Sequence, residues 1–143
     1  MALNKRTPCL GICSTTYGDL VCRGCKRFAH EIVQWNGYDD VQQEQVWQRL
    51  HRLRDEVVTQ HLQVIDQDTY LRVTQATKLD TLEPTERIYE LTRLLVLESQ
   101  PLHKAGIAAK SGEEDALQVL QAIDGEIYIR SQAHYERNFK VPV

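Results

Sequence analysis

The stretch VQQEQVWQRLHRLRDEVVTQHLQVI, residues 41–65, decides the class of fold. Its large side chains recur at steps of three and four residues, which places them on one face of a helix. The members of this face are Trp47, Leu50, Leu53, Val57, His61 and Val64. An aspartate just before the stretch, Asp39 or Asp40, is of the residue type that commonly caps the start of a helix. The pattern predicts a long helix that packs this face against a core.

Helical patterns continue toward the C-terminus. Pro84 suits a first helical turn, and the apolar residues behind it share one helical face. These apolar residues are Ile88, Leu91, Leu94 and Leu95. Pro101 should end this helix, because the residue before a proline disfavours helical backbone. A loop is expected over residues 103–115, and a third helix over about residues 114–124 with Gly125 as its end.

One segment is a strand candidate and another is ambiguous. Residues 126–130, which read EIYIR, are rich in the β-branched and aromatic residues that strands prefer. In residues 66–80, Thr69, Tyr70, Val73 and Thr74 favour a strand, whereas the flanks suggest a break. Pairing of residues 126–130 with residues 70–75 would form a two-stranded sheet. Residues 131–143 are expected to form a terminal strand or docking segment. Contact with nucleic acid through Tyr135, Arg137, Phe139 and Lys140 is the weaker alternative. The predicted fold class is therefore mainly α, with a small irregular four-cysteine lobe at the N-terminus and at most a minor two-stranded sheet.

All four cysteines lie on the N-terminal side of the long helix, within PCLGICSTTYGDLVCRGCKR, residues 8–27. Cys9, Cys13, Cys22 and Cys25 give the spacing C-x3-C-x8-C-x2-C, in which both pairs match the spacing of zinc ligands. Two disulfides are disfavoured, because no secretory signal precedes the segment and cytoplasmic thiols stay reduced. Four unrelated buried thiols are a weaker alternative, since paired C-x2–4-C spacing is a fairly specific signal of a site. A redox-active pair is weaker still, since no strand–helix–strand pattern surrounds the second pair.

The residues around the second pair suit a metal-binding turn. Gly24 allows the tight backbone that brings amides toward sulfur, and the neighbouring cations Arg23, Lys26 and Arg27 favour the thiolate form. Four thiolates without a nearby histidine form a closed site, so the metal is expected to fold the lobe and not to catalyse a reaction. Zinc is the first choice, and an iron–sulfur cluster, which accepts the same ligands, is the alternative.

The segment between the two pairs predicts how they meet. Tyr17, Gly18 and Asp19 have turn chemistry, so a short hairpin would bring the pairs together. The apolar residues expected to surround the site are Leu10, Ile12, Val21 and Phe28.

The same segment resembles a small, uncharacterised bacterial four-cysteine domain family over about residues 7–50. The residues that carry the resemblance form the patterns T-P-C-x-G-x-C, C-x-G-C-x-R and E-I-x-x-W. They are Pro8, Cys9, Gly11, Cys13, Cys22, Gly24, Cys25, Arg27, Glu31, Ile32 and Trp35. Members of the family are often labelled predicted iron–sulfur proteins, so the resemblance implies a metal centre on the four cysteines and leaves the activity open.

The N-terminal part is basic although the whole chain has a net charge of −3. Residues 1–38 hold five Lys and Arg against two Asp and Glu. Arg23, Lys26 and Arg27 cluster beside the second cysteine pair, and Trp35 could either stack on a base or pack a small core. These four residues are the candidates for contact with nucleic acid or a protein partner.

The chain is expected to divide into a metal-binding lobe, residues 1–38, and a helical domain with short strands, residues 39–143. No apolar run is long enough to span a bilayer, so we expect a cytoplasmic protein without a membrane partner. No nucleotide cofactor is expected, because no phosphate-loop or dinucleotide motif is present, and catalysis by the helical part is the least supported hypothesis.

The predicted function is a non-catalytic, metal-stabilised module that binds an unidentified protein or nucleic acid. One alternative is an iron–sulfur protein in electron transfer or redox sensing. The other is a nucleic-acid-binding protein that uses the basic lobe.

Overall fold

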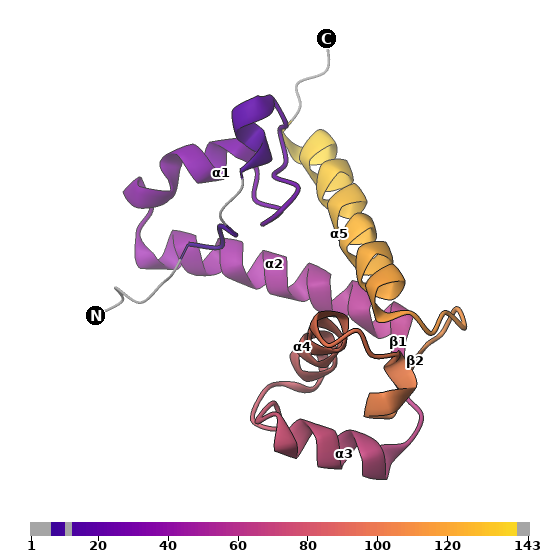
Figure 1. The fold of residues 1–143 in the computed structure, drawn as a ribbon. Coiled ribbons are helices and arrows are strands. Elements are labelled where there is room, and N and C mark those ends of the chain that lie inside the picture. The colour runs from indigo at the N-terminus through magenta and orange to yellow at the C-terminus, as the bar shows by residue number, and fades with distance from the viewer. Residues whose placement is uncertain (1–6, 11–12, 140–143) are drawn as a thin grey trace. The chain divides into compact units, whose positions relative to one another are not determined.

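The computed structural model describes residues 7–10 and 13–139. In chain order these residues form the 3₁₀ helix η2 (Ser14–Tyr17), α1 (Ala29–Gln34), the 3₁₀ helix η3 (Trp35–Gly37), α2 (Asp40–His61), β1 (Leu62–Val64), α3 (Gln67–Ala76), α4 (Pro84–Leu97), the 3₁₀ helix η4 (Leu102–Ala105), β2 (Ile107–Ala109) and α5 (Ala116–Asn138) (Figure 1). The predicted fold class, mainly α with a minor two-stranded sheet, is confirmed. Within the described residues, no helix is long and apolar enough to cross a membrane.

The described residues group into two compact units. The first comprises the residues up to Leu53 together with those from Glu126 onward, and the second comprises Arg54–Gly125. Helices α2 and α5 each contribute to both units. The boundary near residue 38 between a metal lobe and a helical domain remains a prediction.

The two long helices predicted from periodicity are present. Helix α2 begins where expected, because the backbone N–H of Gln42 donates to Asp39 Oδ1 (2.8 Å) and that of Asp39 donates to Gln42 Oε1 (2.9 Å). This reciprocal pair satisfies two backbone donors that the first helical turn leaves without partners. Helix α4 begins at Pro84 and buries Ile88, Leu91 and Leu95 on one face, as its spacing predicts.

The sheet lies in the second unit and is not the one predicted. Strands β1 and β2 pair antiparallel, with Leu62 opposite Ala109 and Val64 opposite Ile107. The predicted loop over residues 103–115 therefore contains β2 and most of η4.

The predicted pairing of residues 126–130 with residues 70–75 is wrong, because both segments are helical. Asp66 caps α3 by accepting the backbone N–H of Thr69 (3.2 Å), and the helix buries Tyr70 and Thr74 on one face. Helix α5 starts at Ala116 and continues through Gly125, because Val119, Ile123, Ile127 and Ser131 recur every four residues on its buried face. Burial at helical spacing outweighs the strand preference of EIYIR. The expected end at Gly125 is wrong for the same reason. A terminal strand is wrong for residues 131–138, which continue α5, and residues 140–143 of that segment lie outside the described residues.

Gly106 closes the connection between η4 and β2 and has a left-handed backbone, with φ of 76°. Its carbonyl accepts the backbone N–H of Ile65 (2.9 Å) and of Asp66 (3.1 Å). A Cβ at this position would lie 2.4 Å from the Asp66 carbonyl oxygen, so the close approach requires glycine.

We expect Gly106→Ala to lower the free energy of unfolding by about 3 kcal/mol, since left-handed strain and overpacking add together. Gly112→Ala is the matched control, because Gly112 also has a positive φ (90°) but faces open space. The control should cost about 1 kcal/mol, from backbone strain alone. Urea unfolding followed by circular dichroism measures both, and equal losses would refute the steric argument.

Candidate functional site

The second cysteine pair lies in a turn closed by the first unit's only isolated antiparallel bridge within the described residues, which joins Val21 to Phe28. Inside it, the backbone N–H of Cys22 donates to the Arg27 carbonyl and that of Lys26 donates to the Cys22 carbonyl, both at 2.9 Å. Lys26 takes a left-handed backbone conformation, with φ of 67°, to complete this turn. These backbone hydrogen bonds give the C-x2-C turn a defined shape.

The expected hairpin between the two cysteine pairs is wrong, because that segment forms η2 and the antiparallel bridge encloses Cys22–Cys25 instead. Val21 and Phe28 are buried beside the turn as predicted. Leu10 is 73% exposed and so does not surround the site, whereas Ile12 lies outside the described residues.

The thiol of Cys22 receives several hydrogen bonds from the backbone around it. Burial disfavours its ionisation, but hydrogen bonds from the backbone of Cys25, Ser14 and Gly24 and from the Cys25 side chain outweigh burial and lower the pKa of Cys22 to about 7. Amides directed at a sulfur stabilise its thiolate, which is the form that binds metals. Protons therefore compete less with a metal at Cys22 than at an ordinary cysteine.

Cys25 differs because a cation contacts its sulfur directly. Burial raises the pKa of Cys25, and Arg27 opposes the rise by donating Nε–H to Cys25 Sγ at 3.3 Å. The Arg27 guanidinium is itself buried and lies 5.0 Å from the ring centroid of Trp35. Arg27 thus places a compensating positive charge between a thiol and an indole ring.

Ser14 connects the first cysteine pair to this turn. Its hydroxyl accepts the backbone N–H of Arg23 (2.8 Å), and its backbone bonds to the Cys22 sulfur. The neighbouring Cys13 is half-buried, and its sulfur lies 2.7 Å from Thr15 Oγ1. Cys9 is exposed and is separated from Cys13 by residues 11–12, which the structure does not describe.

None of the four cysteines, all of which are described, is in a disulfide bond. Over residues 7–10 and 13–139, no three side chains of His, Cys, Asp or Glu come together as a group that could hold a metal ion. The structure therefore establishes a cysteine-rich segment with one shaped turn, and ligation of a single metal by all four cysteines remains a prediction.

The candidate binding residues lie in different environments. Lys26 is 5% exposed, and its ammonium donates to the carbonyls of Arg23 (2.6 Å) and Gly24 (2.9 Å). Trp35 is buried, whereas Arg23 is exposed, pairs with Asp19 at 3.3 Å and lies 4.9 Å from the Tyr128 ring centroid. Lys26 and Arg27 thus direct their charges inward, and nucleic-acid binding by the three cations stays a prediction without structural support.

A buried ion pair anchors the turn to α2, and the sequence analysis did not predict it. Glu31 is 5% exposed, accepts the backbone N–H of Phe28 at 2.8 Å and pairs with Arg49 through two bonds of 2.5 and 2.7 Å. Arg49 also lies 4.3 Å from the Phe28 ring centroid. The capping role of Glu31 could have been predicted from its position in the first turn of α1. No nearby feature of the sequence indicated that Arg49 would be its ion-pair partner.

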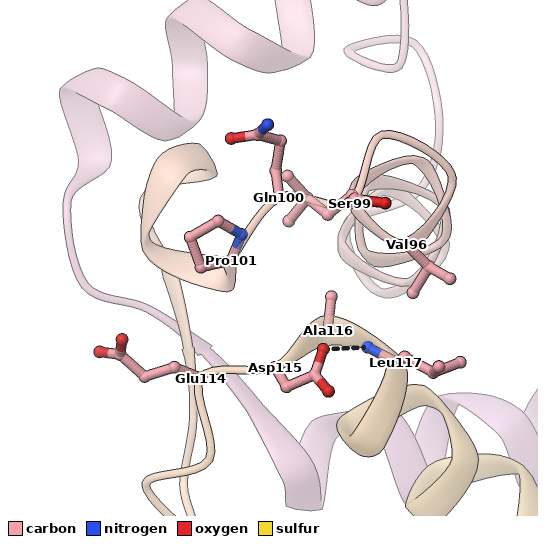
Figure 2. Close-up of a pocket in the computed structure, with 9 residues that line it drawn as sticks. Val96, Ser99, Gln100, Pro101, Glu114, Asp115, Ala116 and Leu117 are labelled. Atoms are coloured by element: carbon pink, nitrogen blue, oxygen red, sulfur yellow. Dashed lines mark hydrogen bonds between the residues drawn. The ribbon is translucent and has the colours of Figure 1, made fainter.

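A hollow of about 400 Å³ lies in the second unit, between the end of α4 and the start of α5 (Figure 2). Two polar groups that line the hollow already accept hydrogen bonds from the backbone. Asp115 Oδ1 accepts the backbone N–H of Leu117 (3.2 Å), and the Glu114 carbonyl accepts that of Leu102 (3.1 Å). The hollow is therefore a weaker candidate site than the cysteine segment.

The fold and the site define a mainly helical protein with a cysteine-rich N-terminal segment. Residues 7–54, about a third of the chain, match the model of a family described as "Protein of unknown function (DUF1289)". The predicted resemblance over about residues 7–50 is thereby confirmed for this segment. No curated protein and no solved structure matches the chain.

Proposed function

We propose that the chain is a metal-binding protein in which Cys9, Cys13, Cys22 and Cys25 hold one structural metal, with zinc as the first choice. The environment of Cys22 carries the proposal, because a buried thiol that receives several backbone hydrogen bonds is prepared to act as a thiolate ligand. Arg27 against Cys25 supplies part of the positive charge that offsets four thiolates. The donor set fits zinc, which would hold the two halves of the cysteine segment together and catalyse nothing.

The segment has a physical need for such a metal. Three of its larger apolar side chains are exposed: Leu10 (73%), Tyr17 (85%) and Leu20 (52%). Few apolar groups therefore remain to stabilise residues 8–20, and metal binding can supply the missing folding free energy. The same exposed side chains favour a role as a macromolecular interaction module, because apolar groups that the fold leaves in water are available to a partner.

An iron–sulfur cluster in electron transfer or redox sensing is the second candidate. It would use the same four cysteines, and hydrogen bonds to sulfur of the kind seen at Cys22 tune the potential of such clusters.

Metal analysis distinguishes the candidates. We expect protein purified without oxygen to be colourless, to contain about one zinc per chain by native mass spectrometry and to lack acid-labile sulfide. A brown protein with sulfide would establish the iron–sulfur alternative. Alkylation of the native protein is the control, because a shared metal should protect all four cysteines. Rapid labelling of all four thiols in undepleted protein would contradict both candidates.

A further inference from the structure

A cationic and aromatic surface of the first unit lies outside the cysteine turn. We define the α2–α5 surface as Arg52 of α2 with His134, Tyr135, Arg137 and Phe139 at the end of α5. The Phe28 ring packs against three side chains of this surface. It stacks on His134 (5.6 Å between centroids), meets Tyr135 edge-on (5.4 Å) and lies 5.2 Å from the Phe139 ring. Figure 1 shows the end of α5 beside the N-terminal segment of this unit.

The positive charges of this surface are not neutralised within the described part of the chain. Glu31 neutralises Arg49, but no described carboxylate pairs with Arg52 or Arg137, both of which are exposed. Burial lowers the pKa of His134, and the guanidinium groups of Arg49, Arg137 and Arg52 lower it further while Glu31 opposes them. Arg52 lies three residues after Arg49 on α2, and Arg137 lies three residues after His134 on α5, so both arginines place exposed positive charge near His134.

An exposed aromatic ring lies next to these arginines. Phe139 is 46% exposed although it lies 5.0 Å from the His30 ring and 5.8 Å from the Tyr135 ring. These contacts leave part of the Phe139 side chain exposed to solvent. Proteins bind single-stranded nucleic acid with aromatic rings that stack on the bases and with guanidinium groups that pair with the phosphates.

We propose that the α2–α5 surface binds single-stranded nucleic acid, with Arg52 and Arg137 on the phosphates and Phe139 stacked on a base. An acidic protein would pair with the arginines but would not use the exposed aromatic side chain of Phe139, on which a base can stack. The inference rests on the proposed role as an interaction module and is independent of which metal the cysteines hold.

The test measures fluorescence anisotropy of a short labelled poly(U) strand with the full-length, metal-analysed protein. The double substitution Arg52→Gln/Arg137→Gln should weaken binding at least tenfold and reduce the slope of log Kd against log salt by about 1.4, since each phosphate contact with a single strand contributes about 0.7. Phe139→Ala should weaken binding about tenfold and leave the salt slope unchanged.

The matched control is Arg72→Gln/Lys104→Gln, which removes two exposed charges from the second unit. It should bind like the wild type. Equal weakening by the control, no binding by the wild type at low salt, or equal competition from polyglutamate would each overturn the inference. Metal content is measured on the same samples, so a wild-type protein that retains the metal but does not bind the strand refutes the surface, whereas absence of metal from the wild type refutes the proposed metal centre.

Discussion

Replacing Cys22 with serine should abolish stoichiometric metal binding and unfold the N-terminal segment. The substitution removes the thiol that the backbone already polarises, and a closed four-thiolate site does not tolerate the loss of a ligand. Structural zinc contributes roughly 10 kcal/mol or more of apparent binding free energy in small domains, so the local effect should be large. Amide exchange should rise sharply from residue 13 to residue 35.

The second unit serves as the internal reference for this experiment. Helix α4 belongs to that unit, so its exchange protection should change little. Arg23→Gln is the control variant, because Arg23 is exposed and its loss leaves all four thiols in place. Collapse of protection in α4 as well would show that the whole chain folds as one unit around the metal. Full metal content in Cys22→Ser would remove Cys22 from the ligand set.

Glu31→Ala should lower the free energy of unfolding by about 3 kcal/mol. The Arg49 side chain is only 21% exposed, so removal of Glu31 would leave its positive charge largely buried and without a partner. Removing one partner of a buried ion pair lowers stability strongly for this reason. The substitution also leaves the Phe28 backbone N–H without its acceptor. Chemical unfolding followed by tryptophan fluorescence measures the loss, because Trp35 is buried in the same unit.

Glu90→Ala is the matched control for this ion pair. Glu90 pairs with Arg93 at 3.1 Å, but the Arg93 side chain is 54% exposed, and such surface pairs contribute less than about 1 kcal/mol. If Glu31→Ala costs no more than Glu90→Ala, the buried pair does not anchor the turn to α2.

Several features of this protein follow from its sequence alone, because they depend on neighbouring residues. The spacing from Trp47 to Val57 predicts most of α2, and the cap at Asp39 follows from a side chain that reaches its own first turn. The start of α4 at Pro84 is equally local. The close spacing of the cysteines identifies the candidate site for the same reason, since short loops bring paired thiols together at little entropic cost.

Only the tertiary structure decided which segments became strands and which charges face solvent. EIYIR has strand preference, yet Ile127 continues a buried face that begins at Val119, and that packing makes the segment helical. Lys26 and Arg27 look like surface cations in the sequence, but the turn directs one onto carbonyls and the other onto Cys25. The packing of Phe28 against His134 and Tyr135 depends on contacts between distant segments, and no local pattern in the sequence encodes such contacts.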